Sequence, residues 1–89
     1  MIKWSVEFSP SAEKEFLSLD KYIQRMIASW IEKNLVGTNN PRSKGKPLVA
    51  NLKGRWRYRI GDYRLICELQ DDRLVILCVT VGHRKEVYK

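Results

Sequence analysis

Four arginines stand close together in the middle of the sequence, at a spacing that suits one kind of chemistry. Arg55, Arg57 and Arg59 alternate with apolar and aromatic residues, and Arg64 follows shortly after the Gly61-Asp62 pair. Arginine grips a phosphate with a planar, two-pronged set of donors and keeps its charge at any working pH. A row of arginines can therefore bind a phosphodiester and neutralise the charge that it gains in a transition state. The pattern indicates nucleic-acid binding and is compatible with phosphodiester cleavage.

Cleavage of RNA also needs a base for the 2′-hydroxyl and an acid for the leaving oxygen, and the C-terminal segment offers two candidates. His83 is the single histidine of the chain, and its reference pKa of about 6.5 suits either duty. It stands beside Arg84, and Tyr88 follows four residues further on. Clustered cations favour neutral imidazole and tyrosinate, which moves both groups towards acting as bases. A lone histidine is more often an ordinary surface residue, so the residues alone leave the base undecided.

Other catalytic signatures are missing from the sequence. It contains no glycine-rich phosphate loop, no nucleophile elbow, no H-E-x-x-H motif and no cluster of carboxylates placed for a metal. Cys67 and Cys78 lie in apolar runs away from any metal-ligand spacing. We interpret both as small buried hydrophobic residues. We therefore expect no metal and no cofactor, and a metal-free mechanism if the protein is a nuclease.

The charge balance narrows the class of partner. Seventeen Lys and Arg against ten Asp and Glu give a formal net charge of +7 over 89 residues, which attracts nucleic acid, an anionic membrane or an acidic protein. No apolar run reaches the ~18–20 residues of a transmembrane helix, so we expect no membrane anchor. The two cysteines do not require an oxidising compartment, and the cytoplasm is the expected location. The length fits one domain, residues 1–89.

The elements that must position the arginines follow from hydrophobic periodicity. Alternation over residues 2–8 predicts a half-buried strand, and Ser9-Pro10 begins a helix that reaches Leu19. Asp20 caps a second helix. Its apolar stripe follows helical spacing and is interpreted as core: Ile23, Met26, Ile27, Trp30, Ile31 and Leu35.

The second half of the chain is predicted to form strands. A long basic loop over residues 41–53 carries Lys44, Lys46 and Lys53, which we expect to contact RNA backbone. Strands then follow over residues 55–60, 63–70 and 73–81, joined by two-residue turns at 61–62 and 71–72. The predicted fold is α+β in two layers: an N-terminal strand, a helical hairpin that covers one face, and an antiparallel β-meander (β-α-α-β-β-β).

The first hairpin fixes where the arginines point. With residues 61–62 as its loop, Arg59 lies opposite Arg64, and the alternate positions turn Trp56, Tyr58 and Leu65 towards the helices. The arginines then share the open face. Continuing the meander through a two-residue second turn places Val79 beside Arg64, and Val81 near residue 62, on that same face.

Like charges on directly opposed residues destabilise a sheet, so this face would reduce the stability of the fold if it contacted only solvent. A ligand with several negative charges would offset that cost. The alternative is a solvated strand whose arginines lie over neighbouring apolar side chains. Few carboxylates are interspersed among the arginines, with Glu68 the nearest in the following strand, and this favours a ligand.

Two motifs in these strands resemble a known family. Residues 56–66 (WRYRIGDYRLI) and 81–88 (VGHRKEVY) resemble the RelE/ParE superfamily of bacterial toxins, and within it the RelE branch. The predicted strand, helical hairpin and basic loop ending at Leu52-Lys53-Gly54 agree with it, so the resemblance covers nearly the whole chain. RelE-type toxins enter the ribosomal A site and cleave the mRNA there, and an antitoxin encoded beside each toxin silences it.

The resemblance implies roles for individual residues. By position, Arg64, Arg84 and Tyr88 match the family's catalytic arginines and tyrosine. Arg59 and Arg57 fall where the family often has lysines, so their electrostatic role carries over and a proton-donating role does not. Some members carry lysine in the place of the histidine. The candidate catalytic set is Arg59, Arg64, His83, Arg84 and Tyr88, with substrate binding by Lys44, Lys46, Lys53, Arg55 and Arg57.

The sequence thus predicts a toxin of a type II toxin–antitoxin pair that cuts mRNA in the ribosomal A site. Attack by the 2′-hydroxyl would give a 2′,3′-cyclic phosphate. The expected partners are mRNA, the ribosome with its 16S rRNA, and an acidic antitoxin. One alternative is a ParE-like inhibitor of DNA gyrase, which shares the fold and is no nuclease; that branch generally lacks the basic and aromatic set. The other is a non-catalytic nucleic-acid-binding module.

Overall fold

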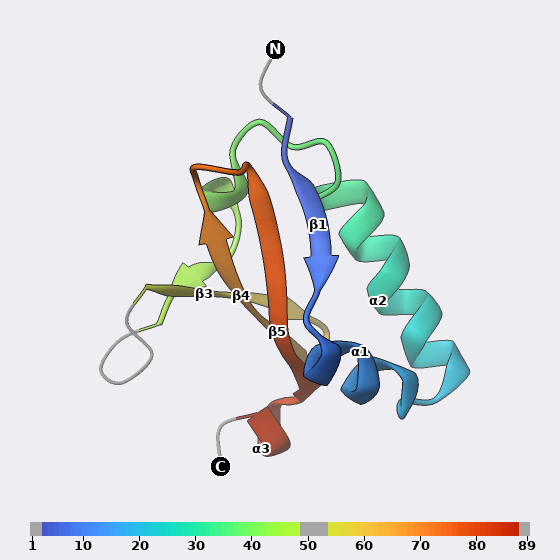
Figure 1. Ribbon diagram of the computed structural model, residues 1–89. Helices are drawn as coiled ribbons and strands as arrows, with labels where there is room; N and C mark the ends of the chain where they lie inside the picture. Colours follow the sequence, from blue (N-terminus) through green and yellow to red (C-terminus); the bar gives the residue numbers. More distant parts are fainter. Residues whose placement is uncertain (1–2, 49–53, 88–89) are drawn as a thin grey trace.

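The protein folds into one five-stranded sheet with a helical pair on one face (Figure 1). The computed structural model describes residues 3–48 and 54–87. The elements are β1 (Ser5–Phe8), α1 (Pro10–Leu17), α2 (Lys21–Asn34), the 3₁₀ turn η1 (Pro41–Ser43), β2 (Lys46–Pro47), β3 (Arg55–Ile60), β4 (Tyr63–Gln70), β5 (Val75–His83) and α3 (Arg84–Val87). The strand order is β1-β5-β4-β3-β2, in which β1 pairs with β5 in parallel and the other pairs are antiparallel. The predicted α+β architecture is confirmed.

Both long helices begin where the sequence places them. The Oγ of Ser9 accepts a hydrogen bond from the backbone N–H of Ala12 at 3.1 Å, and Pro10 occupies the first helical position. Asp20 caps α2 by accepting from the N–H of Tyr22 at 3.3 Å. These caps satisfy backbone donors that a helix start leaves without partners.

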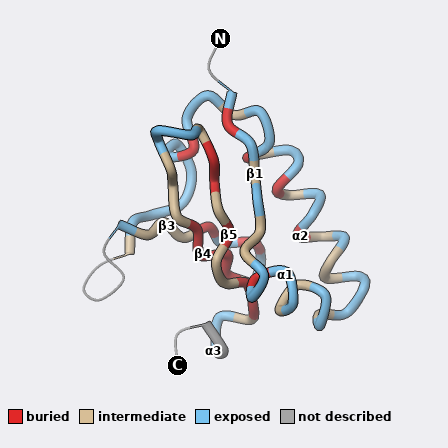
Figure 2. The backbone as a smooth tube through the Cα atoms, in the orientation of Figure 1, coloured by how far each residue is buried: buried red, intermediate tan, exposed pale blue. Residues whose placement is uncertain are grey.

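The core lies between the helical pair and the inner face of β3, β4 and β5. Figure 2 shows the buried positions concentrated along β4 and β5. Ile27 and Ile31 of α2 belong to the same core cluster as Cys67 and Cys78 of the sheet. Both cysteines are fully buried, as predicted, and both are free thiols. Ile23, Met26 and Trp30 of the same stripe are only partly buried and pack against this core.

The β4–β5 connection differs from the predicted two-residue turn. The turn spans residues 71–74, so that Gln70 pairs with Val75. Leu74 adopts a left-handed φ of 55° and packs against the core, and this apolar contact sets the connection where turn chemistry alone would favour Asp71-Asp72. An irregularity where Ile66 and Cys67 pair with β5 then shifts the register once more.

These shifts move the partner of Arg64 from the predicted Val79 to Gly82. An odd shift exchanges the two faces of a strand. Val81 therefore belongs to the core, 3% exposed, and the prediction that it lies on the open face is wrong. The strand continues to His83, and the expected C-terminal tail starts with the helical turn α3.

The predicted long loop is an ordered segment over the part that the structure describes. Residues 41–48, called the basic loop below, contain η1 and the short strand β2. The Tyr58 hydroxyl donates to the carbonyl oxygen of Pro41 at 2.7 Å, and Trp56 Nε1 donates to that of Lys44 at 2.7 Å. Burial raises the pKa of Tyr58 well above its ordinary value, so its hydroxyl stays a donor.

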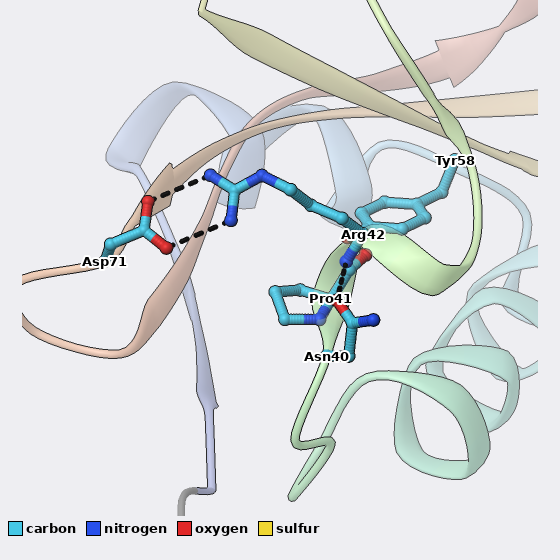
Figure 3. A network of polar contacts seen from close by, with 5 residues as sticks. All are labelled: Asn40, Pro41, Arg42, Tyr58 and Asp71. Carbon is cyan, nitrogen blue, oxygen red and sulfur yellow. Dashed lines mark hydrogen bonds and ion pairs between the residues drawn. The ribbon is translucent and has the colours of Figure 1, made fainter.

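An ion pair joins the basic loop to the β4–β5 turn. The guanidinium of Arg42 meets both carboxylate oxygens of Asp71, at 3.0 and 2.9 Å, and Figure 3 shows the two groups face to face. The hydrogen bonds from Arg42 lower the pKa of Asp71. Asp71 therefore remains charged at neutral pH, and Arg42 is engaged within the protein.

Replacing Ile31 with alanine tests the helical layer. The buried side chain should leave a cavity, so the free energy of unfolding should fall by about 2–5 kcal/mol. Urea unfolding followed by circular dichroism measures this loss. Ser29→Ala, at an exposed position of the same helix, should change stability by less than about 0.5 kcal/mol. Equal stability of the two variants would contradict the placement of α2 over the sheet.

Candidate nucleic-acid interface

The β3–β4 hairpin carries the predicted arginines in the predicted register. Arg59 pairs with Arg64, and Arg57 pairs with Ile66. Gly61 takes a left-handed φ of 60° in the tight turn that fixes this register. Tyr58 and Leu65 are fully buried on the core face. Because side chains alternate along a strand, the arginines belong to the other face, as predicted.

Three of these arginines line one cleft of about 250 Å³. Its walls, called the arginine cleft below, are formed by Trp30, Gly45, Lys46, Arg57, Arg59 and Arg64. Lys46 reaches it because β2 pairs with the edge of β3, where Lys46 lies opposite Arg57. No carboxylate is among these lining residues. Four of these six residues, Lys46, Arg57, Arg59 and Arg64, are predicted site residues that the structure brings together in one cleft.

Arg64 is held more firmly than the sequence indicated. Its residue is only 9% exposed, and Nη1 donates to the carbonyl oxygens of Tyr63 at 3.2 Å and Gly61 at 3.4 Å. Both acceptors are neutral, so they orient the guanidinium without cancelling its charge. The Arg64 side chain therefore also supports the hairpin turn.

Gly45 is a site residue that the sequence analysis missed. It has a left-handed φ of +77°, and a Cβ there would collide with the carbonyl oxygen of Arg57. The same Cβ would lie 2.8 Å from Trp56 Nε1 and 2.9 Å from a ring carbon of Tyr58. Only glycine allows the basic loop to approach β3 this closely. A glycine between two lysines was the available signal.

Two predicted binding residues lie beside the cleft without lining it. Arg55 is next to Glu68, with Nε and Oε2 at 3.8 Å, so a carboxylate offsets part of its charge. Lys44 is exposed, and its carbonyl oxygen holds Trp56. Lys53 and Tyr88 lie outside the described residues, and their predicted roles stay predictions.

His83 is placed differently from the arginines. It pairs with Tyr63 across the sheet, and the two rings meet edge to face at 5.5 Å between centroids. This position alternates with that of Gly82, the partner of Arg64, so His83 belongs to the opposite face. The backbone N–H of Lys85 donates to its Nδ1 at 3.2 Å. The neutral ring then carries its proton on Nε2, and the lone pair that a base would use is occupied.

Arg84 stands at the sheet end next to the hairpin turn. It begins α3 and is exposed, and its backbone N–H donates to the carbonyl oxygen of Asp62 at 2.9 Å. This hydrogen bond ties the C-terminal segment to the turn that follows Arg59. Neither Arg84 nor His83 lines the arginine cleft, although both are anchored to the hairpin that forms it.

A second concave surface lies between β1 and the helical pair. This apolar groove, about 570 Å³, is lined by Val6, Phe8, Glu13, Phe16, Leu17, Ala28, Ile31, Glu32 and Val36. Leu17 and Val36, two large apolar side chains of this lining, are 61% and 53% exposed. Such a surface suits the apolar face of an amphipathic helix. In the part of the chain that the structure describes, no helix is long and apolar enough to span a membrane.

Known proteins resemble this chain in sequence and in fold. A family model described as the ParE toxin of the type II toxin–antitoxin system parDE matches residues 6–88. Toxin RelG of Mycobacterium tuberculosis is 27% identical over 86 residues, which cover 97% of each chain. An Escherichia coli protein described as a RelE-like toxin is 30% identical over 84 residues, 94% of this chain and 86% of its own. A chain of the toxin–antitoxin complex RelBE2 of M. tuberculosis superposes with a TM-score of 0.84 at 27% identity, covering 94% of both chains.

Alanine at position 45 tests whether the close approach of the basic loop builds the cleft. Gly45→Ala and Gly37→Ala both place a side chain at a left-handed φ, which costs about 1–2 kcal/mol. Only Gly45→Ala adds a collision, since nothing lies within 4 Å of a Cβ at Gly37. Its unfolding free energy should therefore fall by a further ~1–3 kcal/mol. Equal losses in urea unfolding would show that the loop does not pack on β3 in this way.

Proposed function

The chain belongs to the RelE/ParE superfamily of toxins, within its RelE-like branch, and we propose that this type II toxin is an endoribonuclease that cuts mRNA in the ribosomal A site. The observation that carries the proposal is the arginine cleft, in which three guanidinium groups and Lys46 converge without a lining carboxylate. Such a site suits a phosphodiester, whose charge it can bind and whose transition state it can stabilise. The proposed location is the cytoplasm, where ribosomes work.

The proposed reaction needs no metal ion. Arg57 and Arg59 hold the scissile phosphate while Arg64, fixed by the turn carbonyls, stabilises the charge that develops on its oxygens. The 2′-oxygen bonds to phosphorus as the bond from phosphorus to the 5′-oxygen breaks. A base removes the 2′-hydroxyl proton and an acid protonates the leaving 5′-oxygen. The products are a 2′,3′-cyclic phosphate and a 5′-hydroxyl.

We assign the base to Tyr88 in preference to His83. The geometry of His83 argues against it, because Nδ1 already accepts the Lys85 N–H and the ring faces Tyr63. The family resemblance supports Tyr88, which shares the short C-terminal segment with Arg84. Arg84 is anchored to the hairpin turn and is proposed to contact the RNA backbone together with Lys44, Arg55 and Lys53.

We propose that the antitoxin is an acidic chain that silences the toxin at both concave surfaces. The solved relative is itself a toxin–antitoxin complex. An acidic segment would neutralise the positive charge of the arginine cleft. An amphipathic helix would cover the exposed Leu17 and Val36 of the apolar groove. Apolar burial should make this complex less sensitive to salt than RNA binding, which depends on phosphate contacts.

A gyrase inhibitor is the second candidate, because the matching family model carries the ParE description. An inhibitor of this type would not cut RNA and would need no convergent phosphate site. A supercoiling assay with purified gyrase separates the two functions. Inhibition at stoichiometric toxin, without cleavage of ribosome-bound mRNA, would favour the second candidate. A non-catalytic RNA-binding module would show neither effect.

Arg59→Ala tests the role of the cleft in catalysis. Arg59 is exposed, so its loss should leave the fold intact while removing one charge contact to the transition state. Cleavage of mRNA on translating ribosomes should slow by about 10²–10³-fold. Arg25→Ala, at an exposed position of α2, removes the same charge away from the cleft and should keep the wild-type rate. Equal rates for the two variants would refute the assignment of the active face.

The pH dependence of the cleavage rate, together with variants of Tyr88 and His83, identifies the base. If Tyr88 acts as the base, the rate should rise with pH towards the ordinary tyrosine pKa of about 10, and the cations next to it in the sequence would move that rise to lower pH. Tyr88→Phe should then be nearly as slow as Tyr88→Ala, while His83→Ala keeps most activity. Single-turnover cleavage across pH measures this. A near wild-type Tyr88→Phe enzyme together with an inactive His83→Ala enzyme would transfer the role to His83.

A further inference from the structure

We propose that Trp30 is a stacking platform for an RNA base, so that the arginine cleft binds a nucleotide by its base as well as its phosphate. This inference rests on the proposed function and adds a positioning residue to it. Trp30 comes from α2 and lines the cleft together with residues of the β3–β4 hairpin, and it is the only aromatic residue among those that line the cleft in the described chain.

The exposure of Trp30 is the first observation. Its neighbours in the same apolar stripe, Ile27 and Ile31, are 0% and 6% exposed, whereas Trp30 is only partly buried. One part of the indole packs on Tyr58, with ring centroids 5.7 Å apart and planes inclined by 52°. Tyr58, which is fully buried, thereby supports the indole, and Trp30 also lines the cleft.

The second observation is the kind of residue on the other walls. Arg57, Arg59 and Lys46 supply the charge that binds a backbone phosphate, and Gly45 contributes a wall without a side chain. Proteins that bind single-stranded nucleic acid combine these same two features, a cationic groove and an aromatic ring on which a base stacks. An RNA base can leave its own stack most easily in a single strand, so the ligand is single-stranded RNA.

The size of the cleft limits what the platform holds. Its volume of about 250 Å³ lies just below the ~300–1,000 Å³ of sites for drug-sized ligands. That space suits one nucleotide. The base would lie against Trp30 and its phosphate among the arginines. Trp30 would then fix which phosphate of the strand enters the site, a positioning role that does not touch the reacting atoms.

Binding of a short oligonucleotide tests this inference without ribosomes. The probe is a fluorescently labelled penta-adenylate with 2′-O-methyl sugars, which cannot be cleaved, and its control is the same backbone without bases. Anisotropy at low salt, where phosphate contacts are strongest, gives the dissociation constants. Trp30→Leu keeps an apolar group against Tyr58 and removes the ring, whereas Trp30→Phe keeps a ring. Tyr22→Leu removes an aromatic ring that is 65% exposed on the same helix and does not line the cleft.

Trp30→Leu should bind the penta-adenylate about tenfold more weakly than the wild type, the loss of one base–aromatic stack. Trp30→Phe should stay within about threefold, Tyr22→Leu should match the wild type, and the abasic chain should bind all of them alike. Quenching of tryptophan fluorescence by the penta-adenylate, reduced in Trp30→Phe, supports the stack even if Trp30→Leu fails to fold. Wild-type affinity of a folded Trp30→Leu protein, with weakened binding by Arg59→Ala, overturns the platform alone. Binding unaffected by Arg59→Ala, or no binding by the wild type, overturns the RNA site and the platform together.

Discussion

The attachment of the basic loop to the edge of β3 is the contact on which the cleft depends. Two side chains of β3 that are turned away from the arginines hold the loop by its carbonyl oxygens, Tyr58 at Pro41 and Trp56 at Lys44. Gly45 lets the two backbones meet. The alternate residues of the same strand, Arg57 and Arg59, face the cleft that results. One six-residue strand thus anchors the loop with one set of side chains and binds the proposed ligand with the other.

Several charges of one sign lie close together in this cleft. Three arginines outside it pair with carboxylates: Arg42 with Asp71, Arg55 with Glu68, and Arg73 with Glu7. Within the cleft, Arg59 lies directly opposite Arg64. Opposed like charges destabilise a sheet, so the arrangement costs folding energy unless an anion is bound. A bound anion would offset this cost, and we propose that the antitoxin and an RNA phosphate compete for this surface.

Local chemistry made much of this predictable from the sequence. The Gly61 turn fixes the first hairpin by itself, so the facing of Arg59 and Arg64 follows from counting residues. The predicted second hairpin was wrong for two reasons. Leu74, which has a left-handed φ and packs on the core, lies in a longer turn, and the irregularity at Ile66 and Cys67 shifts the register once more. Gly45 was missed because its role appears only when β3 lies against it. The register shift that moves Val81 into the core also places His83 on the face opposite the arginines.

The most direct test of the account is to follow mRNA on purified translating ribosomes with the wild-type toxin and to examine both the new ends and their chemistry. Cleavage through the arginine cleft predicts cuts within the A-site codon, a 5′-hydroxyl on one fragment and a 2′,3′-cyclic phosphate on the other. Naked mRNA under the same conditions should be cut far more slowly. Intact mRNA on the ribosome, or fragments that carry a 5′-phosphate, would contradict the proposed chemistry, because attack by the 2′-hydroxyl cannot leave phosphate on the 5′-oxygen.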